Sequence, residues 1–240
     1  MTAGDRSELR SVVFGGETIP FELKRGRGSR LRIAVHPDLR VVVHAPAHAT
    51  TAAIESRVRR RGAWILKHLA RFKDLPPRSQ KHYVSGESVL YLGRQYRLKV
   101  VESSSRSVKL RGRFLWVTAA DKADTNGVKR AVRGWYRVHA RRVFERRLEV
   151  CHAAASRHGI ARPEVRIRWM KTRWGSTPGS SNILLNTQLV KTPTYCIDYV
   201  IMHELCHLNH PHHGKEFYEL LSRCMPDWRA RKERLELAEL

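Results

Sequence analysis

The chain contains one short segment whose residue types could hold a metal ion, His203-Glu204-Leu205-Cys206-His207. If the segment is helical, the spacing of four residues places His203 and His207 one turn apart on the same face, where both imidazoles can bind one ion. Glu204 lies beside this pair. It is too close in sequence to be a comfortable third ligand, but it is well placed to take a proton from a metal-bound water. The segment therefore predicts a zinc-dependent hydrolase with Glu204 as its catalytic residue.

A catalytic zinc ion takes three protein ligands and leaves one position open for water. The third ligand is expected after the helix, where His210, His212 and His213 follow closely. A helix that continued would carry His210 past the ion. Pro211 lets the chain reverse, so that His212 or His213 can return to the metal, and we prefer His213. The pattern thus predicts one Zn²⁺ per chain, against the alternative of a histidine-rich helix end that binds no metal.

The residues around this segment predict a helix that is buried on one side. Pro193 can open the helix, because the missing amide donor of proline costs nothing there, and Thr192 is a candidate cap. Short strands are expected just before it, at residues 165–169 and 182–186. The core-facing stripe of the helix consists of Ile197, Val200, Ile201, Leu205 and Leu208.

The first half of the chain reads as mostly β-structure. Short alternating runs between Ser11 and Ala45 predict antiparallel strands, and residues 88–101 and 107–118 predict further strands with turns inside them. A basic helix is expected at about residues 50–73, and a long basic helix begins after about residue 121. We therefore expect an α+β protein with two parts. Residues 1–120 form a β-rich region, and residues 121–240 form a second domain.

The chain is strongly basic, with 46 Lys and Arg against 22 acidic residues and a formal net charge of +24. Such an excess makes nucleic acid or a nucleotide a candidate partner, although a solvated basic surface is an equal alternative. The four cysteines form no C-x-x-C pair, which favours reduced thiols. No run approaches the roughly 18 apolar residues of a membrane span, and the N-terminus lacks a leader's apolar core. These features predict a cytoplasmic protein with no membrane association.

Several motifs of the C-terminal third resemble the YgjP-like family of predicted zinc-dependent metallohydrolases, which is related to SprT and WLM domains among small gluzincin-type peptidases. The resemblance implies a compact zincin-like domain with an active-site HExxH helix and a small antiparallel sheet. It also implies His203, His207 and His213 as ligands and Glu204 as catalytic acid/base. The chain departs from the family at two positions. Thr177 stands where the family commonly has cysteine, and His212 stands where it commonly has asparagine. The motifs are Trp174-Gly175-Ser176, Ile183-Leu184-Leu185-Asn186 with Leu189, Tyr199-Val200-Ile201 leading into the histidine segment, and His213 with Phe217.

In the zinc peptidases that the chain resembles, an edge strand before the motif helix binds an extended peptide through main-chain hydrogen bonds. The corresponding strand here is residues 183–186. A further donor must stabilise the oxyanion, and Arg173, Tyr199 and His212 are candidates among which no spacing argument chooses. The residues expected to bind a polypeptide substrate are Arg173, Trp174, Ile183, Leu184, Leu185, Asn186 and Tyr199.

Two other functions compete with a metallopeptidase. The same metal site could hydrolyse a phosphoanhydride, and members of the resembled family have been assigned nucleoside-triphosphate pyrophosphatase activity. The sequence has no G-x-x-x-x-G-K loop and no acidic cluster suited to magnesium, which disfavours this alternative. A third hypothesis is a DNA-associated protease that is tethered by its basic N-terminal half, as in the SprT relatives.

Overall fold

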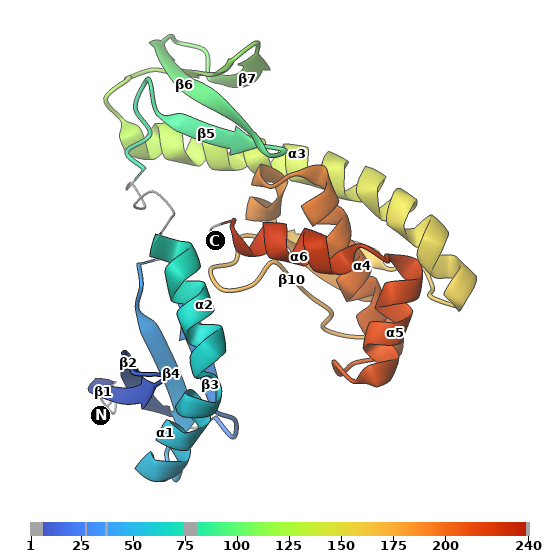
Figure 1. Cartoon of the computed structure of the whole chain (residues 1–240). Coiled ribbons are helices and arrows are strands. Elements are labelled where there is room, and N and C mark those ends of the chain that lie inside the picture. The colour runs from blue at the N-terminus through green and yellow to red at the C-terminus, as the bar shows by residue number, and fades with distance from the viewer. Residues whose placement is uncertain (1–6, 27, 37, 74–80, 239–240) are drawn as a thin grey trace. The chain divides into compact units, whose positions relative to one another are not determined.

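The computed structural model describes residues 7–26, 28–36, 38–73 and 81–238. The chain forms two compact units, Met1–Gln80 (unit 1) and Lys81–Leu240 (unit 2), each with its own hydrophobic core (Figure 1). Both units combine helices with small sheets, so the expected α+β class is confirmed. In the described part of the chain, no helix has the length and apolar character needed to cross a membrane.

Unit 1 is a four-stranded sheet, in the order β1-β2-β4-β3, with two helices packed on one face. Alternate residues of the strands supply the core: Phe21 and Leu23 of β2 and Val43 of β4 pack with Ile54 and Val58 of the first helix. The elements are β1 (Ser7–Phe14), β2 (Glu17–Gly26), β3 (Arg32–Val35), β4 (Val41–Pro46), α1 (Thr51–Arg60) and α2 (Gly62–Lys73).

Two details of unit 1 differ from expectation. β2 and β4 pair in parallel. β3 takes the outer position beside β4 and forms an antiparallel pair with it, so β4 lies between β2 and β3. The expected single helix at residues 50–73 is broken between Arg60 and Gly62. A Cβ at Gly62 would overlap the ring of Phe14, so the close approach of β1 requires glycine at this break.

Unit 2 consists of a second four-stranded sheet, a three-stranded sheet and the remaining helices. Its sheet β5-β6-β8-β7 repeats the strand order and pairing directions of the sheet in unit 1. The elements are β5 (Ser88–Tyr91), β6 (Arg94–Glu102), β7 (Ser107–Arg111), β8 (Phe114–Ala119), α3 (Thr125–Ala155), a 3-10 helix (Ser156–His158), β9 (Glu164–Arg168), β10 (Gly175–Ser176), β11 (Asn182–Asn186), a second 3-10 helix (Thr187–Lys191), α4 (Thr194–Asn209), α5 (Lys215–Cys224) and α6 (Trp228–Glu236).

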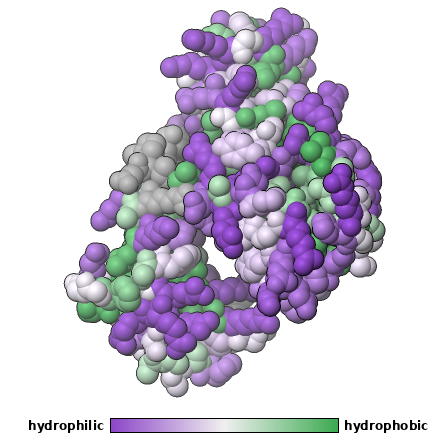
Figure 2. All heavy atoms as spheres, turned by 45° about the vertical axis from the view of Figure 1, so that its right-hand side comes forward, coloured by the Kyte–Doolittle hydropathy of each residue, from purple (hydrophilic) through white to green (hydrophobic). Residues whose placement is uncertain are grey.

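The boundary between the two compact units lies between Gln80 and Lys81, whereas the sequence predicted a boundary between residues 120 and 121. The reason is the second sheet, whose Leu98, Leu115 and Val117 share one core with Val128 and Val132 of α3. Strands that pack directly on the long helix belong to the unit of that helix. The expected domains, residues 1–120 and 121–240, stay a prediction. On the face of the molecule seen in Figure 2, hydrophilic residues predominate and hydrophobic ones form scattered patches.

A cluster of charged residues holds the helices around α4. Asp198 of α4 accepts two hydrogen bonds of 2.6 Å from the guanidinium of Arg147 on α3. Arg231 of α6 lies 3.4 Å from the same carboxylate and also pairs with Asp227 at 2.9 Å. Because the Asp198 side chain is 10% exposed, this ion pair is largely shielded from water and ties three helices together.

The three-stranded sheet next to α4 has the order β10-β11-β9. It is mixed and not antiparallel as expected: β11 pairs antiparallel with β10 and parallel with β9. The long connection after β9 contains β10 and returns the chain to the starting end of β9, and such a crossover produces a parallel pair. β11 is therefore the middle strand, and the expectation that it is a peptide-binding edge strand is wrong.

Candidate metal centre

The helix α4 carries His203, Glu204 and His207, as the spacing predicted. Pro193 occupies the position before its first residue, Thr194, and no side chain caps the helix. Thr192 instead donates to the carbonyl oxygen of Leu189 at 2.8 Å, so its predicted role as a cap is wrong. The expected stripe is buried, apart from the half-buried Leu208, which fixes the opposite side of the helix in the core of unit 2.

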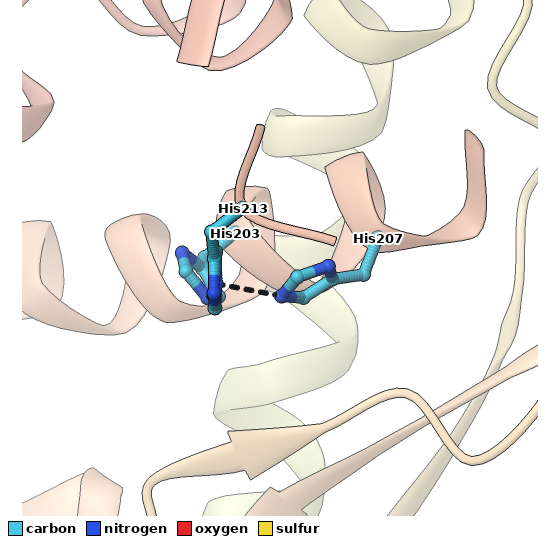
Figure 3. Close-up of side chains that lie close together, drawn as sticks. All are labelled: His203, His207 and His213. Carbon is cyan, nitrogen blue, oxygen red and sulfur yellow. Dashed lines mark hydrogen bonds between the residues drawn. The ribbon is translucent and has the colours of Figure 1, made fainter. Parts of the chain in front are cut away.

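The three predicted ligands lie together (Figure 3). Nε2 of His213 is 3.0 Å from Nε2 of His203 and 3.0 Å from Nε2 of His207, and the three candidate ligand atoms all lie within 4.8 Å of one another. His203 and His207 come from successive turns of α4, and His213 comes from the loop after it. The reversal of the chain after Asn209 thus brings His213 back to the helix, as expected.

The chemistry of this cluster suits a divalent metal. Nδ1 of His207 lies 3.0 Å from the carbonyl oxygen of His210, and a proton on Nδ1 leaves the Nε2 lone pair free to bind. Burial lowers the pKa of His203 to about 3 and also lowers the pKa of His213, so both imidazoles favour the neutral form that a metal requires. If all three Nε2 atoms carry lone pairs, they cannot satisfy one another by hydrogen bonding, because each bond needs a proton between its two nitrogens, and a cation can take the place of that proton.

Phe217 of α5 forms the apolar base of the cluster. It is fully buried, and its ring centroid lies 5.0 Å from that of His203, 4.5 Å from that of His207 and 4.8 Å from that of His213. One aromatic ring in contact with all three imidazoles restricts their orientations. The helix α5 therefore positions the histidines although it contributes none of them.

Glu204 is only 5% exposed and is held by residues 27 and 29 positions away in sequence. Thr177 Oγ1 lies 2.7 Å from Glu204 Oε2 and donates to it. On the other side, a Cβ at Gly175 would lie 2.6 Å from Glu204 Oε1, so glycine leaves room for the carboxylate in this position. Burial raises the pKa of Glu204 to about 7, against the lowering effects of the Thr177 hydrogen bond and the charge of Arg173.

The other expected substrate-binding residues have different environments. Arg173 is exposed and near enough to influence Glu204. Trp174 is half-buried at the core of unit 2. Tyr199 is 7% exposed, and its ring centroid lies 5.8 Å from that of His203. Burial raises the pKa of Tyr199 well above its ordinary value.

The residues of β11 are mostly structural. Ile183 and Leu185 are fully buried, and Leu184 is half-buried and paired with Ser176. Asn186 is fully buried, and its amide nitrogen donates to the carbonyl oxygens of Met170 and Arg173, each at 2.9 Å. This strand therefore supports the loop that carries Arg173 and β10.

Sequence reasoning did not predict the contacts that Thr177 and Gly175 make with Glu204. Gly175 lies inside the Trp-Gly-Ser motif, and Thr177 is a departure from the family pattern. No local pattern connects them to a carboxylate on a helix that begins 17 residues after Thr177, because tertiary folding creates the contact.

The chain matches a known metallopeptidase family. Residues 29–238 match the family described as YgjP-like, metallopeptidase domain. No curated protein matches the chain. Among solved structures, the crystal structure of the metallopeptidase zymogen of Pyrococcus abyssi abylysin is similar, with 23% sequence identity and a TM-score of 0.35. That match covers 38% of this chain and 90% of the other chain.

Proposed function

Because the chain belongs to the YgjP-like family of metallopeptidase domains and is therefore a hydrolase, we propose that it is a zinc-dependent peptidase. His203, His207 and His213 would hold the ion, and Glu204 would act as the catalytic acid/base. The observation that carries the proposal is the convergence of three imidazole nitrogens within 4.8 Å of one another, with the buried carboxylate of Glu204 next to His203 in α4. Three histidines that leave one open position are a typical donor set of catalytic zinc.

When bound, the metal supplies Lewis acidity toward the attacking water and the carbonyl of the scissile peptide bond. Glu204 would take the proton of that water and later deliver it to the leaving amine. Its Oε2 is committed to the Thr177 hydroxyl, which leaves Oε1 to accept the proton. Thr177 and Gly175 would hold the carboxylate in one orientation, so that no reorganisation is needed during the reaction.

We place the substrate on β10 and not on β11. β10 is an edge strand of the described sheet, and a Cβ at its Gly175 would lie 2.6 Å from Glu204 Oε1. A polypeptide that adds to the outer edge of β10 would form main-chain hydrogen bonds and bring its backbone toward Glu204. Arg173 precedes this strand and is exposed, and it is the donor that we favour for the oxyanion.

The test compares the full-length, zinc-loaded protein with Glu204→Gln on two substrates, unfolded casein and a nucleoside triphosphate. We expect casein cleavage to fall about 10²- to 10⁴-fold, the usual contribution of a positioned acid/base. Mass spectrometry of the native protein should still find one zinc ion per chain in the variant.

The matched control is Glu164→Gln, because Glu164 is an exposed acid on β9 that pairs only with Arg166 among the contacts described. This control should cleave casein at the wild-type rate. Casein cleavage that survives Glu204→Gln would refute the peptidase mechanism. If the wild-type protein hydrolyses only the triphosphate and Glu204→Gln abolishes that activity, the site is a phosphoanhydride hydrolase.

A further inference from the structure

Unit 1 contains a basic cleft that the proposed peptidase chemistry does not use. The cleft has a volume of about 660 Å³, and its basic side chains are Lys24, Arg25, Arg30, Arg32 and His44. The other described residues that line it are glycine, serine and alanine, and none of the described lining residues is acidic. A concave surface that is lined by cations and small residues favours an anionic ligand.

Three of these residues form a row across the sheet. His44 of β4 is in register with Lys24 of β2 on one side and with Arg32 of β3 on the other. Residues in register on neighbouring strands share one face, so the three cationic or titratable side chains stand side by side, about 4.8 Å apart from strand to strand. Their sequence neighbours Leu23, Val43 and Ile33 face α1 and α2 in the core, so the row lies on the opposite face.

Part of this charge is not neutralised by the protein. Arg25 donates to the carbonyl oxygen of Ala49 at 2.6 Å and so braces the wall of the cleft, and Lys24 pairs with Glu22 at 3.3 Å. Within the described residues, the side chains of Arg30 and Arg32 form no ion pair or hydrogen bond, and both residues are exposed. Exposed guanidinium groups without an acidic partner suit phosphate oxygens.

A second cleft adjoins the other side of the edge strand β3. It has a volume of about 310 Å³ and is lined by Leu31, Ile33, Arg57, Arg61 and Trp64. The Trp64 side chain is 39% exposed, and its ring centroid lies 4.5 Å from that of His68. An exposed indole accompanied by two arginines offers a surface on which a nucleobase can stack.

We propose that β3 and its two flanking clefts form a binding site for single-stranded nucleic acid, with phosphates on the Lys24–His44–Arg32 row and a base against Trp64. A row of basic side chains suits a linear chain of phosphates better than a single phosphate. The aromatic surface explains the preference for nucleic acid over an acidic polypeptide, which has no rings to stack. A single strand leaves its bases free for such contact, whereas a duplex buries them.

The experiment measures binding of a fluorescent 20-nucleotide oligothymidine by anisotropy, at several salt concentrations. The protein is the full chain with Glu204→Gln, so that the outcome does not depend on peptidase activity. We expect Arg30→Ala/Arg32→Ala to weaken binding at least tenfold and to reduce the salt slope by about 1.4, since each phosphate contact on a single strand contributes about 0.7. Trp64→Ala should weaken binding about 5- to 100-fold.

The matched control is Arg59→Ala/Arg60→Ala, which removes the same charge from exposed positions of α1 that line neither cleft. This control should change affinity less than threefold. Equal losses in both double variants would overturn the proposal, because binding would then follow net charge alone. Circular dichroism and urea unfolding of each variant should match the parent protein; if Arg30→Ala/Arg32→Ala does not fold, Arg32→Gln provides the same comparison.

Competition separates the possible sources of anionic charge. Unlabelled single strand should displace the probe at a concentration at least tenfold lower than polyglutamate of equal charge or a duplex of equal length. If inorganic phosphate or a free nucleoside triphosphate displaces the probe as effectively per molecule as the single strand does, the cleft is a site for simple anions. Polyglutamate that competes equally would identify a nonspecific polyanion surface. Either result contradicts the proposal.

Discussion

The hydroxyl of Thr177 lies 2.7 Å from Oε2 of Glu204 and 3.0 Å from the carbonyl oxygen of the same residue. Its proton goes to the carboxylate, the nearer acceptor. Glu204 is buried, and a hydrogen bond to a buried charged group is stronger than one between neutral groups. Thr177 is therefore a positioning residue for the carboxylate to which we assign proton transfer.

Replacement of Thr177 by valine should slow casein cleavage about 10- to 100-fold. Valine has nearly the same shape but no donor, and loss of a hydrogen bond to a charged group costs about 1.5–3 kcal/mol. The loss should appear in kcat with little change in KM, and zinc content should stay at one ion per chain. Thr177→Ser should restore most of the rate. A serine variant as slow as the valine variant would contradict this role.

Gly175→Ala should abolish most casein cleavage and leave zinc bound. The added methyl group would lie 2.6 Å from Glu204 Oε1, closer than nonbonded atoms approach, so the carboxylate must move. Gly179→Ala is the matched control, because a Cβ there meets no atom within 4 Å. Wild-type activity in Gly175→Ala would show that the position of Glu204 can shift without consequence.

His213→Ala should weaken zinc binding at least 100-fold in a competition titration with a chelator. Loss of a residue that only supports a metal ligand lowers metal affinity about 10- to 100-fold, and loss of the ligand itself should lower the affinity more. His212→Ala tests the alternative third ligand at the adjacent exposed position and should leave zinc affinity unchanged. The reverse result would assign the third position to His212.

Asp198→Asn should lower the free energy of unfolding by about 2–3 kcal/mol in urea. The substitution leaves two arginines beside a neutral amide, and removal of one partner from a buried ion pair usually costs 3–5 kcal/mol. We expect the lower range because Arg147 and Arg231 remain 23% and 24% exposed. Asp227→Asn should cost about 0.5 kcal/mol or less, since Asp227 is 59% exposed. Equal effects of the two variants would remove the structural role assigned to Asp198.

Much of the secondary structure was predictable because it depends on nearby residues. Residues 182–186 were expected to form a strand and do so as β11. The histidine pair was predictable for the same reason, since helical geometry places residues four apart on one face. Convergence of His213 followed from the chain reversal at Pro211 together with the family pattern.

The pairing of strands was less predictable. An alternating pattern shows which face of a strand is buried, but it does not state which strand lies beside it or in which direction. The parallel pairs β2–β4 and β9–β11, and the central position of β11, depend on how the connecting segments cross. The same uncertainty displaced the expected boundary between the two parts of the chain.

Residue identity and spacing thus predicted that His203 and His207 lie together, because both share one helix, and the family pattern favoured His213 over His212 as the third member of the cluster. The environment of Glu204 required the folded chain. Thr177 and Gly175 reach its carboxylate through the packing of β10 against α4, and Phe217 reaches all three imidazoles from α5. Contacts between elements depend on the simultaneous packing of many side chains, which no local pattern of residues encodes.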